Sequence, residues 1–147
     1  MIRKILSTLL LTTLSVMALE QGEILPQPLQ TQLKLEKDKL YVIDFFASWC
    51  KSCKKELPLI ATIHDNNLTE VIGINVDKNR EEGEAFVKKF NLKFPIVYDS
   101  DQALINTFKP LGFPTLYYIK NGKILKSIVG AIDAIDLQIQ KDLKEFK

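Results

Sequence analysis

The sequence predicts an α/β fold in which helices flank a central mixed β-sheet. Short runs of β-branched and aromatic residues alternate with segments of helical periodicity, and Asn121-Gly122 separates two strand-like runs near the end of the chain. The composition agrees, because 147 residues that are 46% hydrophobic and 26% charged can form one ordinary globular core without a disulfide framework or structural metal. We therefore expect one folded domain, with no linker, repeat or low-complexity segment.

The first predicted elements lie on either side of residue 40. Residues 19–38 are polar, and Leu29, Leu33 and Leu35 fit either a short amphipathic helix or a strand. Residues 40–46 are β-branched and aromatic apart from Asp44, which predicts a buried strand interrupted by one acid.

The middle of the chain predicts two helices and a second strand. Residues 53–66 have the spacing of a helix, with Pro58 as a kink, and their apolar positions are Leu57, Ile60, Ala61 and Ile63. Residues 71–76 form a second buried strand, and residues 81–90 a helix whose apolar face is Ala85, Phe86 and Phe90.

The last third of the chain completes the pattern. A short strand at 95–98 precedes a helix at 101–108, with Ser100 or Asp101 as its N-terminal cap. The strands at 115–119 and 123–129 form the hairpin, and residues 133–146 form a closing amphipathic helix whose apolar positions are Ile135, Ile139 and Leu143.

Residues 1–18 have the composition of a secretory signal. Arg3 and Lys4 precede an apolar stretch that is too short for an ordinary membrane span, and the small Ala18 fits a cleavage site directly after it. An uncleaved N-terminal anchor is the alternative. The whole chain carries a net charge of +2, which comes from Arg3 and Lys4, so residues 19–147 are neutral. Neither nucleic acid nor a strongly charged partner is expected.

The candidate chemistry lies at Cys50 and Cys53, the two cysteines of the chain. They form a C-x-x-C pair between a predicted strand and a predicted helix, where the helix N-terminus stabilises a thiolate. A structural disulfide is the other reading, but so short a loop constrains the unfolded chain little. We therefore expect a redox pair, in which the exposed Cys50 is the nucleophile and the more buried Cys53 resolves the mixed disulfide.

Other uses of the cysteine pair do not fit. Haem attachment requires a histidine directly after the second cysteine, where Lys54 stands. A zinc site needs two further ligands, and His64 is the one histidine of the chain, expected at the surface or boundary of its helix. No metal and no other cofactor is expected.

Two acidic residues are candidate bases for the Cys53 thiol. Asp44 stands in the apolar strand, where burial would raise its pKa, and the alternative is that it faces solvent. Glu56 stands three residues after Cys53 on one face of the helix, and the alternative is an exposed residue paired with a lysine. We expect Asp44 to be the main base and Glu56 to modulate it.

The segment from Phe45 to Pro58 resembles the active-site segment of thioredoxin-fold oxidoreductases, and most closely that of the exported TlpA/ResA/CcmG-like group. Residues 112–115 are similar to the cis-proline loop of that group, and the likeness covers about residues 40–129. The separation of 64 residues between Cys50 and Pro114 exceeds that of a plain thioredoxin. The surplus at 77–98 resembles the αβ insertion of the TlpA-like proteins.

The resemblance implies a thioredoxin fold and assigns several roles. Asp44 matches the buried aspartate of thioredoxin, and Glu56 matches the active-site glutamate of ResA-like proteins. A cis Pro114 would lie against the dithiol, and Phe113 would offer its backbone groups to a bound chain. Trp49 would shield the dithiol and contact partners, with packing in the core as its alternative.

The resemblance also implies a function outside the cytoplasm. The expectation is a periplasmic, monomeric thiol-disulfide oxidoreductase that reduces protein disulfides, with the thiols of apocytochrome c as a candidate substrate. A membrane electron-donor protein would then be its partner. A disulfide-forming oxidant or isomerase is the enzymatic alternative, and a non-catalytic binding or chaperone module is the alternative from another class.

Overall fold

The computed structural model describes residues 18–146. Its elements in chain order are α1 (Gln27–Gln32), β1 (Leu40–Phe46), α2 (Lys51–Asp65), β2 (Glu70–Asn75), α3 (Arg80–Lys89), β3 (Ile96–Tyr98), α4 (Ala103–Phe108), β4 (Thr115–Lys120), β5 (Lys123–Val129) and α5 (Ile135–Glu145). The expected signal peptide, residues 1–18, falls outside this range except for Ala18. Among the described residues, no helix has both the length and the apolar character needed to span a bilayer.

The sheet is mixed, as predicted. Its strand order is β3-β2-β1-β4-β5, in which β1, β2 and β3 are parallel and β4 runs antiparallel to both β1 and β5. Asn121 and Gly122 form the β4–β5 turn, and both have positive φ angles, as the hairpin signal requires.

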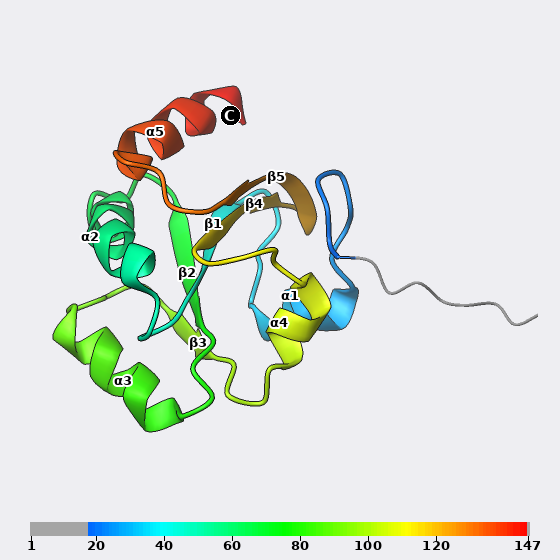
Figure 1. Ribbon diagram of the computed structural model, residues 1–147. Helices are drawn as coiled ribbons and strands as arrows, with labels where there is room; N and C mark the ends of the chain where they lie inside the picture. The colour runs from blue at the N-terminus through cyan, green and yellow to red at the C-terminus, as the bar shows by residue number, and fades with distance from the viewer. Residues whose placement is uncertain (1–17, 147) are drawn as a thin grey trace, which may run out of the picture.

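Helices cover both faces of the sheet (Figure 1), with α2, α3 and α5 on one face and α1 and α4 on the other. Neighbouring side chains of β1 reach opposite faces: Phe45 packs against Phe108 of α4, and Phe46 packs against Phe86 of α3. Asp44 therefore lies on the same face of β1 as Phe46, the face that α2 covers. This alternation brings a carboxyl group beneath the helix that carries the cysteines.

Three local features complete or correct the predictions. Residues 27–32 form the helix α1, which decides between the two structures left open for residues 19–38. Of the two predicted caps of α4, Asp101 accepts the Ala103 N–H at 3.2 Å, whereas the Ser100 hydroxyl has no hydrogen-bond partner among the described residues. The sequence analysis did not identify Asp99, whose two carboxylate oxygens accept the N–H groups of Leu104 and Ile105 at 2.8 Å. A left-handed Gln102 turns the chain back over Asp99 and makes this possible. Residues 77–98, predicted to contain an additional helix and strand, include α3 and β3.

Candidate active site

Cys50 and Cys53 form a disulfide at the start of α2. Cys50 is the N-cap residue of α2, and its Sγ accepts a hydrogen bond from the Cys53 N–H at 3.1 Å. The Cys50 side chain is 6% exposed and Cys53 is completely buried. A partner sulfur can therefore reach the disulfide only at Cys50, whose backbone amide neighbours also favour a negatively charged sulfur.

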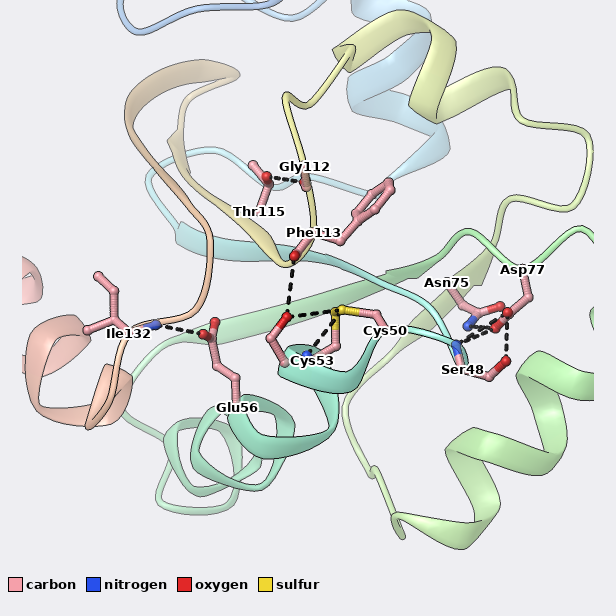
Figure 2. The surroundings of a disulfide bond; sticks show 11 residues. Ser48, Cys50, Cys53, Glu56, Asn75, Asp77, Gly112, Phe113, Thr115 and Ile132 are labelled. Carbon is pink, nitrogen blue, oxygen red and sulfur yellow. Dashed lines mark hydrogen bonds between the residues drawn. A yellow bond between two sulfur atoms is a disulfide. The ribbon is translucent and has the colours of Figure 1, made fainter.

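The loop that leads into Cys50 is fastened by a buried acid that the sequence analysis did not identify. Asp77 accepts hydrogen bonds from the Ser48 N–H at 2.9 Å, the Ser48 hydroxyl at 2.8 Å and the Asn75 side-chain amide at 2.6 Å (Figure 2). Gly83 of α3 packs so closely on Asn75 that an added Cβ would overlap its amide oxygen. The sequence does contain a hint of this contact. Asn75 and Asp77 come at the carboxyl end of β2, Ser48 follows the carboxyl end of β1, and the carboxyl ends of two neighbouring parallel strands lie at the same edge of the sheet.

The loop before β4 lies against the disulfide, as the resemblance implied. The Phe113–Pro114 peptide bond is cis, and the Ser52 hydroxyl lies 3.5 Å from both Cys50 Sγ and the Phe113 carbonyl oxygen. The Thr115 hydroxyl donates to the Gly112 carbonyl at 2.6 Å and so braces the loop from its other end.

Trp49 stands at the surface beside this loop. Its side chain is 63% exposed, so packing in the core, the alternative considered for it, is wrong. The Trp49 ring contacts the Phe113 ring edge-on, with 5.6 Å between centroids. Together with Cys50, these two rings form part of the wall of an open hollow of about 650 Å³.

Both candidate bases are buried. Asp44 is 1% exposed and Glu56 is 3% exposed, so the exposed alternatives considered for these two residues are wrong. Within the described part of the chain, Asp44 Oδ1 has no hydrogen-bond partner, whereas Glu56 Oε2 accepts the Ile132 N–H at 3.2 Å (Figure 2). The roles of the two acids in proton transfer stay predictions.

The surroundings of these acids favour their protonated forms. Burial, with a smaller contribution from the nearby Glu56 carboxylate, holds the pKa of Asp44 well above its ordinary value. Burial also raises the pKa of Glu56, and the hydrogen bond from Ile132 partly offsets that rise. A carboxyl with a raised pKa can exchange a proton with a thiol near neutral pH.

His64 lies partly buried on α2, with its ring edge-on to Phe94 at 6.0 Å between centroids, and has no place at the disulfide. Across residues 18–146, no three His, Cys, Asp or Glu side chains come together in a way that could hold a metal ion. The described site consists of the Cys50–Cys53 disulfide, the acids Asp44 and Glu56, and the loops around them.

Comparison with known proteins gives consistent results. Residues 23–128 match the model of the AhpC/TSA family. The chain is 32% identical over 103 residues to the thiol-disulfide oxidoreductase ResA of Bacillus cereus (strain ZK / E33L), covering 67% of this chain and 60% of that protein. The chain spans about three fifths of the length of the curated relatives it matches.

Solved structures show the same fold. StoA from Bacillus subtilis superposes with a TM-score of 0.64 at 29% identity, covering 74% of this chain and 86% of that one. A putative thiol:disulfide interchange protein DsbE from Chlorobium tepidum superposes with a TM-score of 0.75 at 20% identity, covering 87% of this chain and 98% of that one. The architecture described above is therefore a thioredoxin-like fold.

Proposed function

The chain belongs to the AhpC/TSA family, and on that premise we propose that it is an extracytoplasmic thiol-disulfide oxidoreductase that reduces disulfides of other proteins through Cys50 and Cys53. The observation that carries the proposal is the geometry of the pair: a disulfide at a helix N-terminus, open to a partner at Cys50 and completely buried at Cys53. ResA of Bacillus cereus supports it through its name, and StoA and the DsbE from Chlorobium tepidum support the fold.

The reaction proceeds in two exchanges. In the reduced protein the Cys50 thiolate attacks a partner disulfide, forming a Cys50–partner disulfide and releasing one partner thiolate. Cys53 then loses its proton and attacks Cys50 Sγ, which releases the second partner thiolate and leaves the Cys50–Cys53 disulfide. Two electrons pass to the partner, and an external dithiol must supply them again; a membrane electron-donor protein is the proposed source.

Asp44 is the proposed acceptor of the Cys53 proton. It lies on the face of β1 that α2 covers, and burial holds its pKa well above the ordinary aspartate value, which makes its carboxylate a stronger base toward a thiol. Glu56 shares that environment and acts on Asp44 through its charge. Trp49 and Phe113 form the wall beside Cys50 at which the partner chain is held, and Pro114 shapes the loop that carries Phe113.

The reducing direction and the location rest on the resemblance to the exported TlpA/ResA/CcmG-like group. Within that direction, the thiols of apocytochrome c are the substrate class that the resemblance implies. The opposite direction has one structural argument in its favour: Lys51, Lys54 and Lys55 are exposed on the first turns of α2, and positive charge near Cys50 stabilises its thiolate and raises the reduction potential.

A trapping experiment tests the dithiol chemistry. Cys53→Ser should accumulate a mixed disulfide with a protein substrate, whereas Cys50→Ser should form none and should lose disulfide reductase activity. Full function in Cys50→Ser would instead support the non-catalytic binding module.

The reduction potential of the Cys50–Cys53 pair tests the direction of electron transfer: a value near about −270 mV supports a reductant, and a value near about −120 mV supports an oxidant. Labelling of the reduced thiols in intact cells by a membrane-impermeant maleimide tests the location.

A further inference from the structure

A single buried carboxylate holds the turn that leads into Cys50. Asp77 is 2% exposed, and it accepts hydrogen bonds from the Ser48 N–H, the Ser48 hydroxyl and the Asn75 side-chain amide. All three are donors, so an ionised carboxylate satisfies them, whereas an amide at this position would set its own NH2 group against one of them. In Figure 2 this cluster adjoins the chain directly before Cys50. The anchoring of the turn therefore depends on a carboxylate at position 77.

Asn75 orients Asp77 in a way that leaves one of its own atoms unpaired. The Asn75 side chain is completely buried and its Nδ2 donates to Asp77 at 2.6 Å, while its Oδ1 has no hydrogen-bond partner among residues 18–146. Gly83 of α3 lies directly against that oxygen, and a side chain on Gly83 would overlap it. An unpaired buried acceptor destabilises a fold. A polar cluster kept in the core despite such an atom points to a role beyond stability.

Ser48 lies two residues before the reactive sulfur, so its anchoring fixes the start of α2. The Cys50 N–H donates to the Ala47 carbonyl at 3.2 Å, which closes the turn around Ser48 and Trp49. The Cys50 side chain then caps α2 by accepting the Cys53 N–H at 3.1 Å. A displacement of this turn would move the Cys50 sulfur away from the amide that it accepts.

We propose that Asp77 is a positioning residue for Cys50: through Ser48 it keeps Cys50 in the N-cap position after the disulfide is reduced, where the Cys53 N–H and the helix N-terminus stabilise the Cys50 thiolate. The inference rests on the proposed function, in which that thiolate attacks the partner disulfide. Asp77 acts through Ser48 and not by contact with the sulfur. If the turn loosens, the thiolate loses this stabilisation and the pKa of Cys50 rises.

The sign of the pKa change in Asp77→Asn separates positioning from simple electrostatics. Removal of a nearby negative charge, taken alone, would favour the Cys50 thiolate and lower its pKa. Loosening of the turn raises the pKa instead, and we expect this effect to dominate. Alkylation of Cys50 by iodoacetamide in the reduced protein, followed by mass spectrometry as a function of pH, should then be about threefold slower below the Cys50 pKa than in the wild type.

Ser48→Ala repeats the test without any change of charge. It removes the 2.8 Å hydrogen bond from the hydroxyl but keeps the Asp77 carboxylate and the backbone N–H that donates to it. Any rise in the Cys50 pKa must then come from the turn, and we expect alkylation about twofold slower. All variants keep the other charged groups near Cys50, which are Lys51, Lys55, Asp133, Asp44 and Glu56.

Asp99→Asn is the matched control. Asp99 is also 2% exposed and also accepts two hydrogen bonds from backbone N–H groups, but these belong to α4 on the other face of the sheet. The control should lower the free energy of unfolding, as Asp77→Asn does, and leave the alkylation profile of Cys50 unchanged. The fluorescence anisotropy of Trp49, the one tryptophan of the chain, should fall in Asp77→Asn and not in the control.

A Cys50 pKa that is unchanged or lower in Asp77→Asn would overturn the inference, and so would an unchanged pKa in Ser48→Ala or an equal rise in Asp99→Asn. If Asp77→Asn does not fold, Ser48→Ala decides alone. Alkylation requires no partner disulfide, so failure of the wild-type protein to reduce a protein disulfide would count against the proposed function and not against the role of Asp77.

Discussion

Asp44 and Asp142 are both almost completely buried, but their surroundings are opposite. Asp142 of α5 accepts hydrogen bonds from Lys126 of β5 and from Gln138, each at 2.8 Å. Asp44 has the Glu56 carboxylate as its charged neighbour. The Lys126 ammonium offsets the negative charge of Asp142 and links α5 to β5. Burial and the Glu56 carboxylate instead disfavour the ionised form of Asp44.

The pKa values follow this difference. Burial alone raises the pKa of Asp142, but the partners around it outweigh burial and lower it, while burial and Glu56 both raise the pKa of Asp44. In linkage terms, Asp142 contributes stability above the ordinary aspartate pKa of about 4, and that stability is lost as the pH falls through its lower folded value. Asp44 does the reverse: its contribution is complete below pH about 4 and is lost as the pH rises through its raised folded value.

The largest expected effect comes from removing the uncompensated acid. Asp44→Asn should slow resolution of the mixed disulfide about 100-fold at neutral pH, because the variant offers no carboxylate to take the Cys53 proton. Stopped-flow measurement of the release of the second partner thiol reports this step. Asp133→Asn, which removes an exposed acid beside the same hollow, is the control and should react at nearly the wild-type rate. An unchanged resolving rate in Asp44→Asn would end its assignment as the base.

Removing the compensated acid should affect stability rather than chemistry. Asp142→Asn should lower the free energy of unfolding by about 2 kcal/mol at pH 7, because the Lys126 ammonium loses a charged partner. The loss should disappear in acid, where the wild-type carboxyl is also protonated. Urea unfolding at several pH values checks this. In the same series, the free energy of unfolding of Asp44→Asn should rise relative to that of the wild type as the pH rises. A change of the same sign in both variants would show that the two acids do not differ as described.

Contacts local in sequence were predictable. The strand–helix order, the Asn121-Gly122 hairpin and the placement of Cys50 at a helix start all follow from residue periodicity and turn chemistry within a few positions. The burial of Asp44 was also foreseen, because its neighbours on β1 are apolar. These features depend on the sequence within one element.

Contacts between distant segments were not predictable in the same way. The anchoring of Ser48 by Asp77 joins residues 29 apart, and the hydrogen bond from Ile132 to Glu56 joins residues 76 apart. Neither pairing produces a periodic pattern in the sequence, since the first forms when β1 and β2 pair and the second when the segment before α5 lies against α2. For the same reason, the sequence did not decide whether Trp49 is exposed or packed in the core. Its position depends on the distant loop that carries Phe113, whose ring it contacts.

The smallest expected effect separates the two acids of the site from each other. Glu56→Gln removes the negative charge that helps to raise the pKa of Asp44, so the pH at which the resolving rate reaches half its maximum should fall. The maximal rate should change little, because Asp44 still takes the proton. The pH–rate profile of resolution measures this. Unfolding of the oxidised protein checks that the hydrogen bond from the Ile132 N–H, which a glutamine amide oxygen can still accept, is kept. A fall in the maximal rate with no displacement along the pH axis would make Glu56 itself the base and Asp44 its modulator.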